Sequence, residues 1–482
     1  MSATEPYIQR ARTKIVVTVG PACNEPQMLL DMVNQGTDVF RLNMAHGNRL
    51  EHQQAVENIR QISQDCGRPI AILVDLAGPK IRLGKLPQDL IECHRGEEFR
   101  FRADGESTGP YELTSNYSAL VEELSEGDHV MLADGQVSMR VTRIEEGVAH
   151  CEVVQPGAIR SRQGINLPGV KLSVKAITTE DRENAIWAAQ NKIDFIGLSF
   201  VRSAKEIKEL KQYVSDQGSA AMVIAKIEKP EALEVLEEIV EAADAVMVAR
   251  GDLGVEIDVA QTPMVQKRII KVCQQYSKPV IVATQMLDSM HRSLQPTRAE
   301  VTDVANAILD GTDACMLSGE TAIGQYPRET VEMMNRIMLA TERGLSETTA
   351  QAPGSARIAA VHPVTRAVVL GAAQIAKELA AKLVVIATHS GKTARIKAKQ
   401  RDFIPTVGIS DSEQTLCQLA LYWGIIPIRG ITMDDKGQIR EAIEAWGVAD
   451  GCLAAGDRVV FVVGTGLATL AHNVVSVHEV PE

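Results

Sequence analysis

Ala221-Met-Val-Ile-Ala-Lys-Ile-Glu228 is an apolar run that ends in charged residues, and Ala245-Val-Met-Val-Ala-Arg-Gly-Asp252 repeats the pattern further along the chain. Between the two runs, Glu231–Glu241 has apolar residues at helical spacing. A strand, a helix and a second strand in this order predict two parallel neighbours in one sheet. The stretch therefore predicts one complete β/α unit and the start of the next.

Charged residues close both runs. Residues two apart in an extended strand share a face, so we expect Lys226 to point with Glu228, and Arg250 to point with Asp252. The carboxyl ends of parallel strands meet at one edge, which brings these charges together. Such a group can hold a divalent metal and an anionic substrate at the same time.

Apolar runs of this kind occur eight times, with helical patterns such as Gln27–Gln35 and Thr297–Leu309 after them. The predicted strands are Lys14–Pro21, Asp38–Met44, Ile70–Gly78, Asp194–Phe200, Met222–Glu228, Ala245–Asp252, Pro279–Met286 and Ala314–Thr321. Eight β/α units are the number that closes a (β/α)₈ TIM barrel.

Two further segments depart from the barrel pattern. Residues 82–173, between the third and fourth runs, alternate polar and apolar residues and predict an inserted small β-barrel domain near the active-site loops. After a linker that begins at Ser346, four strand candidates alternate with helices and predict an open α/β domain. We expect a barrel of residues 1–81 and 174–345, an inserted domain of residues 82–173 and a C-terminal domain of residues 346–482.

The composition argues against several classes of protein. A net charge of −12 and only 4% aromatic residues disfavour a nucleic-acid or anionic-membrane partner. The segment Met1–Lys14 is polar and no long apolar stretch occurs, so we expect a cytoplasmic protein without membrane spans. Eight cysteines without a Cys-x-x-Cys pair predict free, mostly buried thiols.

Polar residues stand at the end of every predicted barrel strand. They are Thr18; Arg41, Asn43 and His46; Asp75, Lys80 and Arg82; Ser199 and Arg202; Lys226 and Glu228; Arg250 and Asp252; Thr284; and Ser318 with Glu320. Packing can explain a single ion pair, but charges repeated around one rim are costly unless a ligand or metal completes their pairing. The cations suit phosphoryl oxygens, the carboxylates of Glu228 and Asp252 suit Mg²⁺, and the backbone at Gly251 suits a substrate carboxylate.

A series of specific motifs runs along the chain in a fixed order. They are Thr18-Val-Gly-Pro-Ala22, Arg41-Leu-Asn-Met-Ala-His-Gly47, Asp75-Leu-Ala-Gly-Pro-Lys-Ile-Arg82, Gly164-Ile-Asn-Leu-Pro-Gly169, Ala225-Lys-Ile-Glu-Lys-Pro-Glu231, Met247-Val-Ala-Arg-Gly-Asp-Leu-Gly254, Ala283-Thr-Gln-Met286, Pro296-Thr-Arg-Ala-Glu300 and Leu317-Ser-Gly-Glu-Thr-Ala322. With these motifs the chain resembles the pyruvate kinase family over essentially its whole length.

The resemblance implies phosphoryl transfer from phosphoenolpyruvate to ADP, giving pyruvate and ATP, with Mg²⁺ or Mn²⁺, in a homotetramer. The inserted domain would then be a lid that excludes water from the barrel mouth. The implied roles are phosphoryl contact for Lys226 and Arg41, metal ligation for Glu228 and Asp252, and proton transfer near Thr284. The backbone of Ala249, Gly251 and Asp252 would bind the substrate carboxylate, and Thr18, Asn43, His46 and Arg82 would line the nucleotide side.

One departure from well-known family members concerns K⁺, which many of them bind beside the phosphoryl group. Ala45 stands where those members have Ser, and Lys80 stands where they have Glu. A lysine ammonium is a fixed monovalent cation, so we predict activity without K⁺. The alternative is that Lys80 pairs with a carboxylate of the inserted domain.

The C-terminal domain contains Thr388-His-Ser-Gly-Lys-Thr393 between a predicted strand and a predicted helix. The matching loop of the family holds the phosphate of an allosteric effector, which implies a phosphate site formed by Thr388, Ser390, Gly391, Lys392 and Thr393. Residues 464–467, Gly-Thr-Gly-Leu, could complete it. The alternative is an ordinary capped helix start.

Two other functions compete with this interpretation. A metal-dependent pyruvate aldolase or lyase shares the barrel and the carboxylate pair, but it has no need of Arg41, Lys80 and Arg82 or of a lid. A catalytically silent metabolite sensor would use the C-terminal domain alone, and the intact set Lys226, Glu228, Asp252 and Thr284 argues against it.

Overall fold

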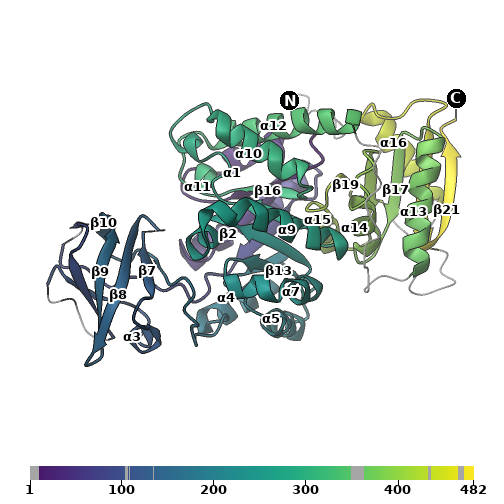
Figure 1. The fold of residues 1–482 in the computed structure, drawn as a ribbon. Coiled ribbons are helices and arrows are strands. Elements are labelled where there is room, and N and C mark those ends of the chain that lie inside the picture. Colours follow the sequence, from purple (N-terminus) through teal and green to yellow (C-terminus); the bar gives the residue numbers. More distant parts are fainter. Residues whose placement is uncertain are drawn as a thin grey trace.

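Figure 1 shows a central barrel with a β-rich domain on one side and an α/β domain on the other. The computed structural model describes residues 10–88, 90–103, 107, 109–133, 135–348, 363–431, 436–464 and 472–481. Within these ranges, no helix has the length and apolar character needed to cross a membrane.

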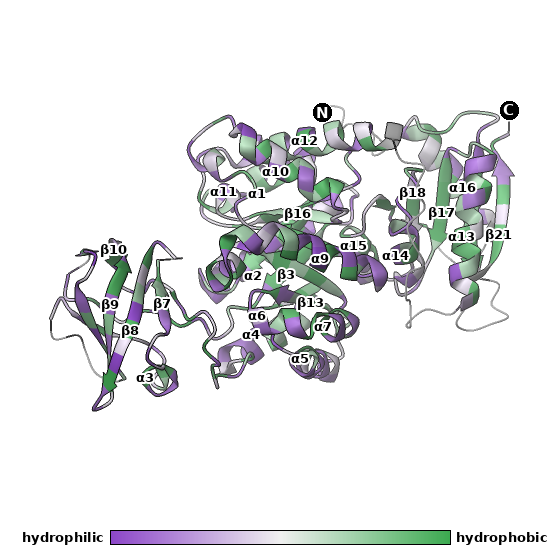
Figure 2. Ribbon diagram, in the orientation of Figure 1, coloured by the Kyte–Doolittle hydropathy of each residue, from purple (hydrophilic) through white to green (hydrophobic). Residues whose placement is uncertain are grey.

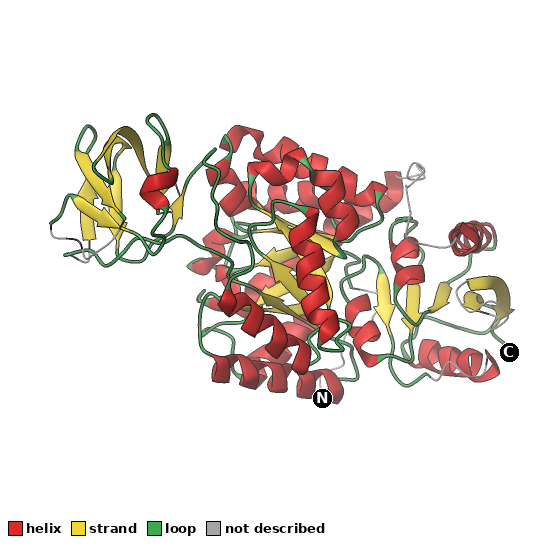
Figure 3. Ribbon diagram, turned by 90° about the horizontal axis from the view of Figure 1, so that it is seen from below, coloured by secondary structure: helices red, strands yellow, loops and turns green. Residues whose placement is uncertain are grey.

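Eight parallel strands close the barrel in the order β1-β16-β15-β14-β13-β12-β3-β2, which confirms the predicted TIM barrel. The strands are β1 Lys14–Thr18, β2 Thr37–Asn43, β3 Ala71–Asp75, β12 Phe195–Leu198, β13 Met222–Ile227, β14 Ala245–Ala249, β15 Val280–Ala283 and β16 Ala314–Leu317. Nearly all their residues are buried. Helices cover the outer face of the barrel (Figure 3), and the inward-pointing side chains of the strands pack inside it. Figure 2 shows the same arrangement as hydrophobic strands behind helices with hydrophilic outer faces.

Helices connect the barrel strands. They are α1 Pro26–Gln35, α2 Arg49–Asp65, α4 Thr179–Gln190, α5 Ala204–Asp216, α6 Pro230–Glu234, α7 Leu236–Ala242, α8 Arg250–Glu256, α9 Thr262–Gln275, α10 Arg298–Leu309, α11 Gly319–Ala322 and α12 Pro327–Thr348, with 3₁₀ turns η2 Val259–Gln261 and η3 Asp288–His291. Capping boxes start several of them, as at Thr178 with Asp181 and at Thr297 with Glu300. Each fixes where a helix begins relative to the preceding strand.

In the described residues of the insert, 82–173, the one helix is the short α3 Leu120–Glu123, and the other elements are strands. Its strands are β4 Leu90–Cys93, β5 Glu98–Arg102, β6 Glu112–Thr114, β7 His129–Leu132, β8 Val137–Glu145, β9 Val148–Gln155, β10 Gly157–Arg160 and β11 Ile165–Asn166. They form a six-stranded sheet in the order β11-β7-β8-β9-β5-β6 and a two-stranded sheet of β10 and β4. Along β5 the buried Phe99 and Phe101 alternate with exposed charges, so the insert has its own hydrophobic core.

The C-terminal domain has a five-stranded sheet in the order β19-β18-β17-β20-β21. Its elements are α13 Pro363–Glu378, β17 Leu383–Ala387, α14 Lys392–Ala398, β18 Thr406–Ile409, α15 Glu413–Leu419, β19 Ile425–Pro427, α16 Lys436–Ala449, β20 Arg458–Gly464 and β21 His472–Glu479. The antiparallel edge strand β21 was not among the four expected strands. The predicted linker starts too early at Ser346, since α12 continues to Thr348, and the rest of that linker lies outside the described residues.

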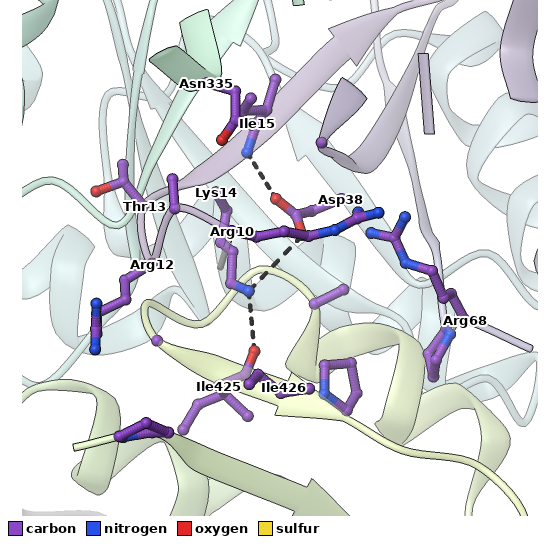
Figure 4. A pocket seen from close by; sticks show the side chains of 17 residues that line it. Arg10, Arg12, Thr13, Lys14, Ile15, Asp38, Arg68, Asn335, Ile425 and Ile426 are labelled. Atoms are coloured by element: carbon purple, nitrogen blue, oxygen red, sulfur yellow. Dashed lines mark hydrogen bonds and ion pairs between the residues drawn. The ribbon is translucent and has the colours of Figure 1, made fainter. Parts of the chain in front are cut away.

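Buried polar contacts join the C-terminal domain to the amino-terminal end of the barrel. Asp313, directly before β16, receives Lys399 Nζ at 2.5 Å and an Arg401 nitrogen at 3.0 Å. Lys14 Nζ donates to the carbonyl of Ile425 at 2.9 Å, beside a pocket between the two domains (Figure 4). The C-terminal domain therefore lies at the end of the barrel opposite the predicted catalytic rim.

Candidate active site

The carboxyl ends of the barrel strands bring together most of the predicted catalytic residues. Lys226 lies near the end of β13 and Glu228 directly follows that strand. Asp252 lies in α8 after β14, and Thr284 directly follows β15. Arg41 comes from β2 on the other side of the barrel. These residues are therefore close in space although they are far apart in the sequence.

Lys226 is the centre of the rim. Its ammonium lies 2.9 Å from Glu228 Oε1 and 3.2 Å from Asp75 Oδ1, and it donates to Ser199 Oγ at 2.7 Å. All four side chains are buried. Burial alone would lower the pKa of Lys226, but the charges of Asp75 and Glu228 outweigh it and raise the pKa above its usual value. Lys226 is therefore a fixed cation.

Asp75 connects Lys226 to Arg41. Arg41 donates to Asp75 Oδ2 through Nε at 2.8 Å, and its other guanidinium nitrogens lie 2.6 Å from Asp75 Oδ2 and 3.0 Å from Thr18 Oγ1. Burial opposes ionisation of Asp75, but Lys226 and Arg41 together keep its pKa below the usual value. Asp75 had no assigned role in the sequence-based site, although a carboxylate closing an apolar run was visible there. It holds both cations at the rim through these contacts.

The predicted pairing of Arg250 with Asp252 on one strand face is wrong. Strand β14 ends at Ala249 and helix α8 begins at Arg250, so the two residues follow a helical course. The Arg250 guanidinium turns away and bonds Asp303 at 2.7 Å and the carbonyl of Thr284 at 2.8 Å. Arg250 is thus a structural residue, while Asp252 stays at the rim.

Thr284 has a backbone conformation that few side chains adopt, with φ of 70°. Its hydroxyl accepts a hydrogen bond from the amide of Gly251 at 2.7 Å and donates to the carbonyl of Ala283 at 2.6 Å. The bond joins the end of β15 to the first turn of α8. It fixes the Thr284 hydroxyl beside the Gly251 backbone, where the sequence predicted substrate.

Basic residues also gather on the side of the rim that faces the insert. Burial lowers the pKa of His46, and the nearby charges of Arg82, Lys80 and Arg41 lower it further. Lys80 Nζ lies 3.8 Å from Asp252 Oδ1. Asn43 holds the turn after β2, because its side chain accepts from the amide of Ala45. Of the predicted nucleotide-side residues, Asn43, His46 and Arg82 therefore lie in this part of the rim. Thr18 is buried at the end of β1, where its hydroxyl accepts from Arg41 and donates to the carbonyl of Leu317.

Two carboxylates are available for a metal. Burial raises the pKa of Glu228, and the negative charge of Asp252 adds to that effect. Phe200 donates its amide to Glu228 Oε2 at 2.7 Å, which fixes the carboxylate. Across the part of the chain that the structure describes, no group of three or more His, Cys, Asp or Glu residues could hold an ion. A metal here would need further oxygens from substrate or water.

The predicted effector loop is far from this rim, in the C-terminal domain. Gly391 has a left-handed φ of 72° and its amide donates to Thr388 Oγ1, directly before α14. His389 pairs with Asp411 at 2.7 Å beside it. Residues 465–467, which were expected to complete the loop site, lie outside the described residues.

The fold and the rim define a class of protein, a barrel phosphotransferase with a domain inserted after the third strand. Models of the pyruvate kinase barrel domain and the pyruvate kinase alpha/beta domain match residues 10–331 and 366–478. The chain belongs to the pyruvate kinase family.

Proteins similar to this chain are named pyruvate kinase. A pyruvate kinase of Agrobacterium vitis is 40% identical over 95% of this chain and 96% of its own length, and one of Geobacillus stearothermophilus is 37% identical over 98% and 81%. A crystal structure of a pyruvate kinase from Cryptosporidium parvum is 31% identical, covers 98% of this chain and 97% of its own, and superposes with a TM-score of 0.90. The chain is thus an enzyme that transfers a phosphoryl group from phosphoenolpyruvate to ADP.

Proposed function

We propose that Lys226 is the central catalytic residue of this phosphoryl transfer. Its fixed charge, held between Asp75 and Glu228, would stabilise the negative charge on the transferring phosphoryl group. Arg41 would contact the same group from β2, and Thr284 would lie beside the carbon of enolpyruvate that is protonated. The observation that supports this proposal most is the buried contact set around Lys226.

We further propose that Glu228 and Asp252 hold a divalent cation, Mg²⁺ or Mn²⁺. Two carboxylate oxygens suit such a cation, and the cation would offset the burial that raises the pKa of Glu228. When bound, it would polarise substrate oxygens and neutralise their charge. At the start of α8 the backbone of Ala249, Gly251 and Asp252 would bind the substrate carboxylate, which would replace Thr284 Oγ1 as the acceptor of the Gly251 amide.

The nucleotide would bind at the side of the rim that faces the insert. Asn43, His46 and Arg82 come from this side and Thr18 from the adjacent strand β1, and the basic residues among them suit a diphosphate. The insert, residues 82–173, would close over it as a lid, and residues 1–81 with 174–345 would form the catalytic barrel.

Lys80 would replace K⁺. Its ammonium lies 3.8 Å from Asp252 Oδ1, so a permanent positive charge already stands beside the proposed metal ligand. Among the described residues, the ion pair recorded for Lys80 is with the barrel and not with a carboxylate of the insert. This geometry supports Lys80 as a replacement for K⁺ over the alternative that Lys80 pairs with a carboxylate of the insert.

The enzyme would act as a cytoplasmic homotetramer. Its C-terminal domain, residues 346–482, would bind a phosphorylated metabolite at Thr388, Ser390, Gly391, Lys392 and Thr393. The left-handed Gly391, whose amide donates to Thr388 Oγ1 directly before α14, supports a compact turn at this position. Saturation kinetics with candidate sugar phosphates and nucleotides test it. A response that persists in Lys392→Ala would contradict this loop as the phosphate site.

The experiment for the catalytic proposal is pyruvate formation from phosphoenolpyruvate, coupled to NADH oxidation by lactate dehydrogenase. Omitting ADP separates phosphoryl transfer from a lyase or aldolase reaction, which would not depend on a nucleotide. Omitting the divalent metal tests whether the reaction needs the cation that Glu228 and Asp252 are proposed to hold.

A further inference from the structure

Glu256 is a buried carboxylate that none of the roles above uses. It is the last residue of α8, and its side chain is 1% exposed. Oxygen Oε1 of Glu256 lies 2.6 Å from Lys229 Nζ and accepts a hydrogen bond from Asn166 Nδ2 at 3.2 Å. We refer to Asn166, Lys229 and Glu256 as the Glu256 cluster.

The Glu256 cluster joins the two segments that hold the proposed metal ligands. Lys229 directly follows Glu228 and precedes the first turn of α6. Glu256 stands four residues after Asp252 in α8, so the two carboxylates lie on the same side of that helix. Through the Lys229 side chain, one oxygen atom of Glu256 therefore links the segment that follows Glu228 to the helix that bears Asp252.

The third member of the cluster belongs to the insert. Asn166 lies in β11, a two-residue strand that pairs with β7 inside the insert. After β11 the chain returns to the barrel. A second contact lies close by, because a methyl group placed on Gly135 of the insert would stand 3.5 Å from Val255 Cγ2 in α8. The insert thus reaches α8 at two adjacent residues, Val255 and Glu256.

The connections between the insert and the barrel leave open space beside the cluster. A pocket beside it is lined by both segments that connect the insert to the barrel, Pro79–Ile81 and Ile165–Leu167, together with Lys229. Side chains of the two connections leave this space open, and the lid movement proposed above for the insert would take place at these connections. Any such movement changes the position of Asn166 and acts directly on Glu256.

We propose that Glu256 is a positioning residue that couples the placement of the insert to the spacing of Glu228 and Asp252. The inference rests on the proposed metal ligands. Removing the Glu256 charge frees Lys229 and the end of α8, so the two ligands are no longer held at a common distance. Removing the Asn166 amide leaves the buried ion pair whole but cuts its link to the insert.

Binding of Mn²⁺ alone and of Mn²⁺ with phosphoenolpyruvate, followed by the electron paramagnetic resonance of free Mn²⁺, measures this coupling without catalysis. We expect Glu256→Gln to raise the Kd for Mn²⁺ at least about tenfold, as changes behind metal ligands commonly do. Asn166→Ala removes one hydrogen bond to a charged group and should raise the Kd measured with phosphoenolpyruvate about fivefold. Lys229→Arg keeps the ion pair, so its Kd should stay within about twofold of the wild-type value.

Two controls separate this effect from others. Asp313→Asn also removes one partner of a buried ion pair, but at the far end of the barrel, and should leave the Kd for Mn²⁺ unchanged. Glu228→Gln should abolish tight binding, and a normal Kd in that variant would refute the metal site itself. If Glu228→Gln fails to bind while both Glu256→Gln and Asn166→Ala bind like wild type, the metal site stands and the coupling is wrong. Should Glu256→Gln not fold, Asn166→Ala decides the question alone.

Discussion

Lys80 Nζ lies 3.8 Å from Asp252 Oδ1, although Lys80 precedes the insert and Asp252 belongs to a helix far along the chain. The contact places a permanent cation at the edge of the proposed metal site. About a third of each side chain is exposed, so the pair itself adds little to stability. The contact matters because the positive charge of Lys80 can offset negative charge on a substrate bound at this site.

The first prediction is that turnover does not require K⁺. In buffer free of Na⁺ and K⁺, with tetramethylammonium as the counter-ion, we expect the rate to lie within about twofold of the rate with 100 mM K⁺. Lys80→Ala should lower turnover at least about tenfold because the fixed charge is lost, and added K⁺ should restore part of it. A wild-type enzyme that is strongly activated by K⁺ would rule out this role for Lys80.

The second prediction concerns the divalent metal. Chelation with excess EDTA should abolish activity, and Mg²⁺ or Mn²⁺ should restore it. Glu228→Gln should raise the metal concentration for half-maximal rate at least about tenfold, because one of two carboxylate ligands loses its charge. The matched control is Glu234→Gln, in the neighbouring helix α6. Equal metal dependence of the two variants would contradict the assignment.

The third prediction concerns how the C-terminal domain is held. Asp313 pairs with Lys399 and Arg401 and also accepts the amide of Val280, with almost no exposure to solvent. Asp313→Asn removes the carboxylate that pairs with both buried cations, so it should lower the free energy of unfolding by about 3–5 kcal/mol. Urea denaturation followed by circular dichroism measures the change. Asp411→Asn, which removes a more exposed partner of His389, should cost less than about 1 kcal/mol.

The fourth prediction is a dependence of stability on pH. Burial lowers the pKa of Lys278 to about 8, and the charge of Arg395 contributes. Between about pH 8 and the usual lysine value of 10.5, the unfolded chain binds more protons at this residue than the folded chain, so the contribution of Lys278 to stability rises with pH. The full shift corresponds to roughly 3 kcal/mol.

The measurement is the free energy of unfolding of wild type and Lys278→Met from pH 7 to pH 10. Wild type should gain stability relative to the variant through this window, since only wild type has the buried ammonium that loses its proton. Parallel curves for the two proteins would show that Lys278 titrates normally.

The barrel was predictable because its strands repeat a strong local pattern. All eight predicted strands are present, but each ends one to four residues earlier than expected, as β14 does at Ala249 rather than Asp252. The cause at Arg250 is tertiary: Asp303 and the carbonyl of Thr284 draw its guanidinium away and allow α8 to begin there. The strand pattern contains no information about such partners.

Other features depend on contacts between distant segments. The antiparallel strand β21 pairs with β20 at the edge of its sheet, and its sequence follows residues that lie outside the described part of the chain. Asp75 was visible as a rim carboxylate, but its contacts with both Arg41 and Lys226 exist only in the closed barrel. Glu256 gave no sequence signal at all, because its partners Asn166 and Lys229 come from other elements.

The most direct measurement of the central claim is the rate of pyruvate formation by wild type and by Lys226→Met, with phosphoenolpyruvate, ADP and Mg²⁺. Lys211→Met, which removes a surface lysine that pairs with Asp244, is the matched control. We predict an ADP-dependent rate for wild type and for the control, and a kcat about 10²–10³-fold lower for Lys226→Met with its fold retained. A wild-type protein that forms no pyruvate with either Mg²⁺ or Mn²⁺, or a Lys226→Met variant as fast as wild type, would contradict the account.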